Sequence, residues 1–275
     1  MLPGPLRTLP AASGDGHTLT GNIHRLDAFR SDVLDNTRDV HVYLPPGYET
    51  DTGRRYPVLY LHDGQNVFDG ATSYVHGQEW RVDESAERLI VAGEVRPVII
   101  VAVDHAGHDR AHEFAPTRDG SRDAGGHADA YGIFLLDELK PWVDGRFRTR
   151  AEPRATAVGG SSLGGLVTLH LGLTRPEAIG GLLVMSPSLW WDRRVLIDRY
   201  SELRGRLPWR IWLDCGTGEG RDTLRNVRAL RSILMKKGWT GGADLRYVEA
   251  KHATHCEAAW ADRVPDALRF LFPPG

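Results

Sequence analysis

The chain has 275 residues, of which 41% are hydrophobic and 25% are charged, with a formal net charge of −2 and a pI of about 6.6. This length suffices for one large domain with a sizeable core, and the near-neutral charge disfavours nucleic-acid or anionic-membrane partners. Cys215 and Cys256 are too few for a disulfide framework. The N-terminus has no signal-peptide pattern, and no segment approaches the ~20 apolar residues of a membrane span. We therefore expect a cytoplasmic protein.

Residues 1–17, rich in Pro, Gly and Ala, are predicted to be a lead-in to a single domain over residues 18–275, since no linker or repeat divides the remainder. Apolar runs and alternating patterns indicate strands. The expected strands are 18–29 (an edge strand), 39–44, 56–61, 97–103, 155–158, 181–186, 210–214 and 245–249.

Helical periodicity is present in the segments between several of these strands. The expected helices are 80–91, 131–143, 163–173, 222–237 and 257–272, and the polar stretch 104–129 is expected to be a surface loop near the site entrance. Because strands and helices alternate, the chain is predicted to have an α/β fold, with a mainly parallel sheet and helices on both faces.

The most informative stretch is 155–166, where Gly160, Ser162 and Gly164 form the pattern G-x-S-x-G between an apolar strand and a helix. In that context the pattern is typical of a nucleophile elbow, which exposes a serine above the carboxyl edge of a parallel sheet. The two flanking glycines relieve crowding in the turn, and Gly165 lets the helix lie close to the sheet. The alternative is a glycine-rich turn without chemistry.

A nucleophilic serine needs a base, and the base needs an acid that orients it. Downstream of the serine, His252 and His255 both follow the last strand, and either could be a solvated loop residue. We favour His255, because it directly precedes the final helix and Trp260 can anchor its loop. Three carboxylates are candidates for the acid: Asp214 at the end of a strand, Glu219 in the following loop, and Asp222, which could instead cap a helix.

An oxyanion hole requires two backbone N–H groups. We assign them to Leu163, which follows the serine, and to Gln65, in the turn after the 56–61 strand. Trp190 and Trp191 could line a substrate pocket or simply pack in the core. The histidines at 105, 108 and 112 lie in a polar loop without the spacing of a metal site, so no metal and no cofactor are expected.

Six segments of the chain match, in order, a known protein family. They are Val42-Tyr-Leu-Pro-Pro-Gly-Tyr48, Tyr56-Pro-Val-Leu-Tyr-Leu-His-Asp-Gly-Gln-Asn66, Gly160-Ser-Ser-Leu-Gly-Gly165, Ser186-Pro-Ser-Leu-Trp-Trp191, Gly216-Thr-Gly-Glu219 and His255-x-Glu-x-x-Trp260. From about residue 18 onward the chain resembles the putative-esterase family of α/β-hydrolases. That family includes enterochelin esterases, S-formylglutathione hydrolases, feruloyl and acetylxylan esterases, and mycobacterial mycolyltransferases.

The resemblance implies an α/β-hydrolase fold, Ser162 as nucleophile, His255 as base and Gln65 as an oxyanion donor. The family's Gly-Thr-x-acid pattern falls on Glu219, where relatives often carry Asp. Gly218 and Gly220 flank Glu219 and would let its carboxylate reach His255. Enterochelin esterases carry an extra N-terminal domain that we do not expect in this protein, and this expectation disfavours a ferric-siderophore substrate.

The expected function is cofactor-independent hydrolysis of a small-molecule carboxylic ester through an acyl-serine intermediate. Two alternatives remain. One is acyl transfer to another alcohol by the same residues, and the other is a catalytically silent binding protein on this fold.

Overall fold

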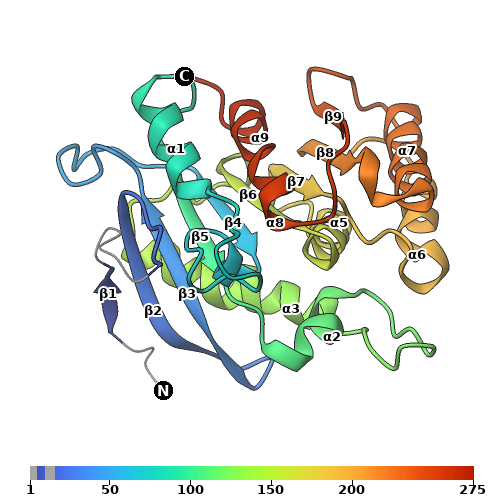
Figure 1. Ribbon diagram of the computed structural model, residues 1–275, viewed down its shortest axis with the longest axis horizontal. Coiled ribbons are helices and arrows are strands. Elements are labelled where there is room, and N and C mark those ends of the chain that lie inside the picture. The colour runs from blue at the N-terminus through green and yellow to red at the C-terminus, as the bar shows by residue number, and fades with distance from the viewer. Residues whose placement is uncertain (1–4, 10–15) are drawn as a thin grey trace.

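The computed structural model describes residues 5–9 and 16–275, and its central feature is one twisted sheet (Figure 1). The strands of the described residues lie in the order β1-β2-β3-β5-β4-β6-β7-β8-β9. Their bounds are β1 Leu6–Thr8, β2 Asn22–Ser31, β3 Asn36–Leu44, β4 Val58–His62, β5 Ile99–Val103, β6 Thr156–Ser161, β7 Gly181–Met185, β8 Arg210–Gly216 and β9 Leu245–Ala250.

The first three strands are antiparallel to their neighbours, and β3 also pairs antiparallel with β5. From β5 to β9 all neighbours are parallel, which confirms the predicted mainly parallel sheet. The prediction that the strand near 18–29 lies at the edge was wrong. Leu6–Thr8, inside the expected lead-in, forms β1 and pairs outside β2. Much of that lead-in, 1–4 and 10–15, lies outside the described residues, so the domain division stays a prediction.

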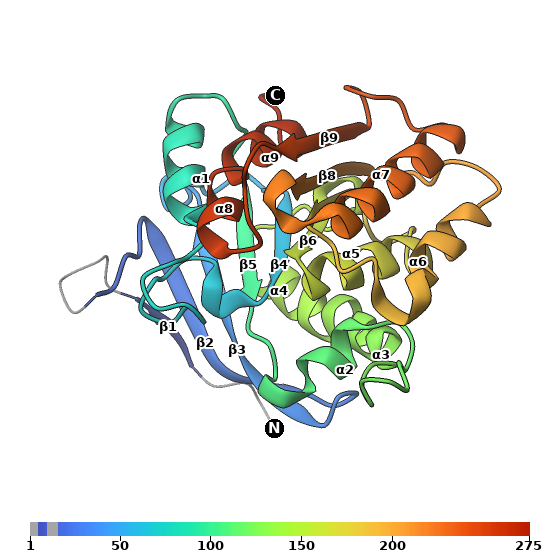
Figure 2. The ribbon, with the colours of Figure 1, turned by 45° about the vertical axis from the view of Figure 1, so that its right-hand side comes forward.

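The helices pack on both faces of the sheet (Figure 2). Their bounds are α1 Val82–Val91, α2 Arg110–Phe114, α3 Ala128–Ile133, α4 Lys140–Arg146, α5 Leu163–Thr174, α6 Trp191–Ser201, α7 Arg221–Lys236, α8 Glu257–Ala261 and α9 Val264–Leu271, and the π-helix η3 Phe134–Leu139 joins α3 to α4. One core cluster combines α5, α6, α7 and η3 with one face of the sheet, and the other combines α1, α8 and α9 with the opposite face.

Three expectations about helices were wrong. The 104–129 segment is not all loop, since it contains α2, a short 3-10 turn (Gly107–Asp109) and the start of α3. Helix α6 was missed, because the backbone at 192–194 is left-handed with φ of 39, 54 and 73°, and no regular helical period starts there. The final helix is broken between α8 and α9, where Pro265 lies at the start of α9 and cannot donate a hydrogen bond.

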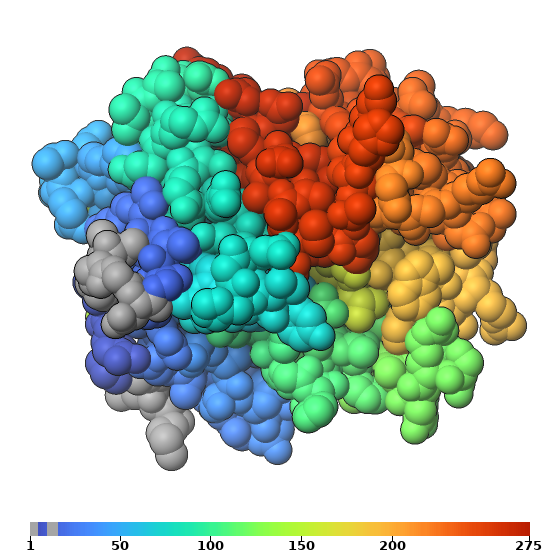
Figure 3. All heavy atoms as spheres, in the orientation of Figure 1, coloured from blue at the N-terminus to red at the C-terminus, as the bar shows by residue number. Residues whose placement is uncertain are grey.

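The sheet brings distant loops together at its carboxyl edge. The 3-10 turn η1 (Gly64–Asn66) follows β4, helix α5 follows β6, the turn η5 (Thr217–Glu219) follows β8, and the loop before α8 follows β9. Because carboxyl ends of parallel strands meet at one edge, these four loops are neighbours in space. Figure 3 shows the cyan residues that follow β4 and the red residues that precede α8 on the same face.

Within the described residues, none of the helices combines the length and the apolar composition that a membrane crossing requires.

Candidate active site

Ser162 occupies a strained backbone conformation between β6 and α5. Its φ of 57° and ψ of −118° lie outside the regions that L-residues ordinarily adopt. Three backbone hydrogen bonds hold it there: its N–H donates to the Met185 carbonyl (3.0 Å), and its carbonyl accepts from the N–H groups of Ser188 (3.0 Å) and Leu166 (3.1 Å). Strained residues of this kind gather at functional sites, because the surrounding structure must enforce them.

The glycines around the serine have different roles. A Cβ on Gly160 would lie 2.8 Å from the Gly164 carbonyl carbon, so a side chain at 160 would force the turn apart. At Gly165 a Cβ would lie 3.1 Å from the Met185 carbonyl oxygen and 3.2 Å from Pro187, which confirms that this glycine brings the helix close to the end of β7. At Gly164 the nearest atoms would be 3.4 Å away, an ordinary contact, so crowding is not the reason for a glycine there.

His255 and Glu219 form a hydrogen-bonded pair across the gap between two loops. The imidazole Nδ1 lies 2.8 Å from the Glu219 Oε2 atom. The Glu219 side chain is 1% exposed, whereas that of His255 is 42% exposed. The rings of His255 and Trp260 also pack edge to face, with centroids 5.0 Å apart and an interplanar angle of 82°. The expected anchoring of the histidine loop by Trp260 is therefore confirmed.

The second carboxylate oxygen of Glu219 is held by a buried network. Oε1 accepts a hydrogen bond from the Ser186 hydroxyl (2.6 Å) and another from the Gly216 N–H (2.7 Å). The same hydroxyl accepts from Trp260 Nε1 (3.0 Å) and from Arg263 Nη2 (3.1 Å). One donor and two acceptor sites are all that a hydroxyl offers, so Ser186 is fully used.

This network determines the charge of Glu219. Burial alone would raise its pKa, but the hydrogen bonds from His255, Ser186 and the Gly216 N–H outweigh that effect, and the pKa of Glu219 lies below its ordinary value. The carboxylate is consequently ionised at neutral pH and can stabilise a positive charge on the imidazole.

The sequence did not single out Arg263 or the role of Ser186. Ser186 belonged to a matched motif, but Arg263 has no signal of its own inside a predicted helix. Both are buried, with Arg263 5% and Ser186 1% exposed.

The other two candidate acids lie elsewhere. Asp214 is fully buried; its carboxylate accepts from Trp212 Nε1 (2.7 Å) and lies 3.1 Å from Arg263 Nε. The side-chain partners of Asp214 therefore lie in its own strand and directly before α9. Asp222 has an 81% exposed side chain that pairs with Arg225 (3.0 Å). It is not a helix cap either, since α7 begins at Arg221 after Gly220.

His252 takes no part in the pair with Glu219. Its backbone is left-handed, with φ of 61°, and its N–H donates to the Thr217 hydroxyl (2.7 Å). That hydrogen bond fastens the histidine loop to η5, while the side chain remains exposed.

Two backbone N–H groups near Ser162 are without acceptors. Within the described residues, neither the Leu163 N–H nor the Gln65 N–H donates to a backbone or side-chain oxygen. The turn that carries Gln65 packs directly against β5. A Cβ on Gly64 would lie 2.7 Å from the backbone of that strand, so only glycine fits there. Before it, Asp63 adopts a left-handed conformation (φ 58°) and binds Arg110 through both carboxylate oxygens, at 2.6 and 2.8 Å.

The Ser162 side chain does not contact His255. Its Oγ lies 3.3 Å from the Ser188 Oγ, and no hydrogen bond to the imidazole is present. Long nucleophile–base separations are common without substrate, and a rotation about the Cα–Cβ bond can redirect the hydroxyl.

The two tryptophans differ in exposure. Trp190 is 42% exposed, and the Arg122 guanidinium lies 4.6 Å from its ring centroid. Trp191 is 2% exposed, and its Nε1 donates to the Thr117 carbonyl (2.9 Å). Trp191 therefore packs in the core, and only Trp190 has a surface that a substrate could reach.

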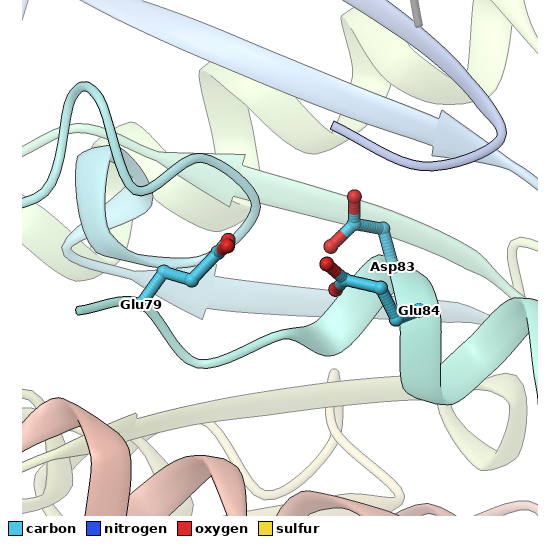
Figure 4. Close-up of side chains that lie close together, drawn as sticks. All are labelled: Glu79, Asp83 and Glu84. Atoms are coloured by element: carbon cyan, nitrogen blue, oxygen red, sulfur yellow. The ribbon is translucent and has the colours of Figure 1, made fainter. Parts of the chain in front are cut away.

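Among the described residues, one group of side chains could hold a metal ion: Glu79, Asp83 and Glu84 (Figure 4). Burial and the neighbouring Glu84 raise the pKa of Asp83, and burial raises that of Glu79 to about 7. The carboxylates of Glu79 and Asp83 also accept hydrogen bonds from the Thr18 hydroxyl and the Thr20 N–H, respectively. The raised pKa values favour protonated carboxyl groups, which can lie close together without a metal ion. The hydrogen bonds to Thr18 and Thr20 show what the cluster does in the fold: it fastens residues 18–20 to α1 and to the segment directly before it.

The comparisons with known proteins agree with this geometry. The family profile described as "Putative esterase" matches residues 31–271. This chain belongs to that family. The match and the esterases among its relatives identify the chain as a carboxylic ester hydrolase.

Two relatives and one solved structure show how far the likeness extends. The endo-1,4-beta-xylanase/feruloyl esterase of Xylanibacter ruminicola is 33% identical over 223 residues, which is 78% of this chain but 28% of that protein. The ferri-bacillibactin esterase BesA of Bacillus subtilis is 24% identical and matches 82% of each chain. The BES protein of Bacillus cereus superposes with a TM-score of 0.73 at 21% identity, over 96% of this chain and 99% of that one. The fold that this structure shares with the chain confirms the predicted α/β-hydrolase fold.

Activity is expected to be independent of metal, because neither Glu219 nor His255 contacts the acidic cluster of Figure 4. Exhaustive dialysis against EDTA should leave the rate of p-nitrophenyl acetate hydrolysis unchanged. A loss of rate that one divalent ion restores would contradict this expectation.

Proposed function

We propose that this esterase hydrolyses its substrate through an acyl-enzyme intermediate, with Ser162 as nucleophile, His255 as base and Glu219 as the orienting acid. The observation that carries the proposal is the 2.8 Å hydrogen bond between His255 and the buried Glu219, formed beside the strained Ser162 elbow. Glu219 fixes which imidazole nitrogen bears the proton. With Nδ1–H bound to Glu219, Nε2 is free to accept a proton from the serine.

The reaction has two steps. In the first, Ser162 Oγ bonds to the ester carbonyl carbon and its proton passes to His255 Nε2. The tetrahedral intermediate then collapses, the bond to the alcohol oxygen breaks, and the imidazolium returns the proton to that oxygen. In the second, water attacks the acyl-serine by the same route and releases the acid.

The negative oxygen of each tetrahedral intermediate needs preorganised donors. The unpaired N–H groups of Leu163 and Gln65 support the assignment of the oxyanion hole to them. The N-terminus of α5 adds its partial positive charge at the same place.

The same residues would also transfer an acyl group to an alcohol other than water. A silent binding protein is disfavoured, because a buried ionised carboxylate paired to an exposed imidazole has no evident structural purpose. Hydrolysis of p-nitrophenyl acetate by the purified protein, with and without an added alcohol, separates the three alternatives.

For the substrate, we propose a small-molecule ester with an aromatic acid component, since one relative is a feruloyl esterase. The half-exposed Trp190, stacked by Arg122, offers a ring surface for such a group. Parallel assays with acetyl, feruloyl, thioester and catechol-siderophore substrates test this choice.

Ser162→Ala is expected to reduce kcat by a factor on the order of 10⁴ or more, because alanine leaves this position of the elbow without an oxygen nucleophile. The fold should persist, since alanine keeps the Cβ that the backbone already accommodates. Steady-state kinetics and covalent labelling with a fluorophosphonate measure the effect. Labelling at the neighbouring Ser161, or more than a hundredth of wild-type activity, would refute the assignment.

His255→Ala should be as damaging as the serine change, whereas His252→Asn should have a mild effect. Asparagine is the matched control, because it tolerates the left-handed backbone at 252. Equal losses in the two variants would leave the base unassigned.

Glu219→Gln should lower kcat by about 10⁴-fold, since the amide cannot balance the charge of the imidazolium. Asp222→Asn should leave kcat within about tenfold, because Asp222 is exposed and pairs only with Arg225. Kinetics below the melting transition of each variant separate catalysis from stability. The reverse pattern would make Asp222 the acid.

A further inference from the structure

A hollow of about 310 Å³ lies at the amino ends of β6, β7 and β8, at the sheet edge opposite Ser162. Four arginines from three segments surround it: Arg96 before β5, Arg150 and Arg154 before β6, and Arg210 at the start of β8. Apart from Thr156, its remaining lining residues are apolar or glycine, and no acidic residue from the described parts of the chain lines it.

Only part of this positive charge is neutralised. The Arg150 guanidinium donates to Glu152 Oε1 at 2.7 and 2.9 Å, and Arg154 lies 3.6 Å from the same oxygen. Arg96 Nε donates instead to a neutral acceptor, the Pro273 carbonyl (2.7 Å). One carboxylate therefore serves two of the four guanidinium groups.

Arg210 is the least satisfied of the four. Its Nε is buried and without a hydrogen-bond partner, while its guanidinium lies 4.5 Å from the Phe270 ring centroid. Asp244 is the acidic residue whose charge acts on Arg210, but its carboxylate forms an ion pair with Arg206 at 3.0 Å. Burial and the charge of Arg96 lower the pKa of Arg210, so the two guanidinium groups destabilise each other. In the described part of the chain neither one forms an ion pair with a carboxylate.

The positive surface continues beyond this hollow. A second hollow of about 320 Å³ shares Pro57, Arg96 and Arg150 with the first, and adds Arg54 and Arg55. A chain with a net charge of −2 thus concentrates six arginines at one edge of its sheet. Such a concentration creates a positive local potential, which attracts anions to this edge.

We propose that this arginine hollow binds a small molecule carrying phosphate groups, with Arg96 and Arg210 as its principal charged contacts. Guanidinium groups bind tetrahedral oxyanions through paired N–H donors, and they lose less hydration than an ammonium in doing so. Two unpaired guanidinium groups match a ligand with two or more negative charges. Since the hollow and Ser162 lie at opposite sheet edges, the ligand is distinct from the ester substrate.

The test is a titration of the purified protein with inorganic pyrophosphate at constant ionic strength, followed by thermal unfolding and by calorimetry. Saturable binding should raise Tm, on the order of 5 °C at one hundred times Kd. Sodium chloride at the same ionic strength should leave Tm unchanged. Inorganic phosphate should bind more weakly, because it carries fewer charges. No saturable heat, or an equal response to chloride, would refute the proposal.

Three variants locate the site. Arg96→Gln and Arg210→Gln should each weaken pyrophosphate binding at least tenfold. Arg193→Gln, which removes the same charge from a 95% exposed side chain in α6, should bind as the wild type does. If Arg210→Gln is poorly folded, Arg96→Gln alone decides, since Arg96 lies outside the sheet. Equal Kd values in all three would overturn the assignment.

The Ser162→Ala variant keeps this proposal separate from the catalytic one. It should bind pyrophosphate with the wild-type Kd while losing esterase activity. Loss of pyrophosphate binding in Ser162→Ala would contradict an independent site.

Discussion

The backbone of Ser162, held at φ 57° and ψ −118°, is the constraint on which the rest of the site depends. Such a conformation is unfavourable by itself and persists only because β7 supplies a hydrogen bond to its N–H and the loop after β7 supplies one to its carbonyl. Those partners require β6 and β7 to pair in parallel and α5 to start within one residue of β6. The contacts that Cβ atoms on Gly160 and Gly165 would make show how closely the helix and the strands approach there.

A second requirement concerns the charge of Glu219. An isolated carboxylate with a 1% exposed side chain would take up a proton and could not support an imidazolium. Hydrogen bonds from the Ser186 hydroxyl and the Gly216 N–H stabilise the ionised carboxylate of Glu219. The positively charged Arg263 guanidinium lies 4.0 Å from the same carboxylate. The indole of Trp260 contacts both sides of this pair: its N–H donates to the Ser186 hydroxyl, and its ring packs against the ring of His255.

The two edges of the parallel sheet have opposite electrostatic character. At the carboxyl edge, the charged groups near the serine are paired: Arg110 binds Asp63, and His255 binds Glu219. At the amino edge, Arg96 and Arg210 have no carboxylate partner among residues 5–9 and 16–275. One sheet can therefore present an ester site and an anion site that do not share residues.

The sequence alone determined the alternation of strands and helices, the mainly parallel sheet and the esterase family, because apolar periodicity and contiguous motifs are local properties of the chain. It also predicted that Ser162 lies in a turn between a strand and a helix, because the G-x-S-x-G pattern and its apolar flanks are local as well. It left Asp214, Glu219 and Asp222 all open as partners of the histidine until a family pattern was applied. Only the tertiary structure separated them, since burial and the partners of a carboxylate depend on residues such as Arg263 and Trp260, which lie far along the chain. Helix α6 and the edge strand β1 were likewise decided by packing, because a left-handed start and a three-residue strand carry no periodic signal.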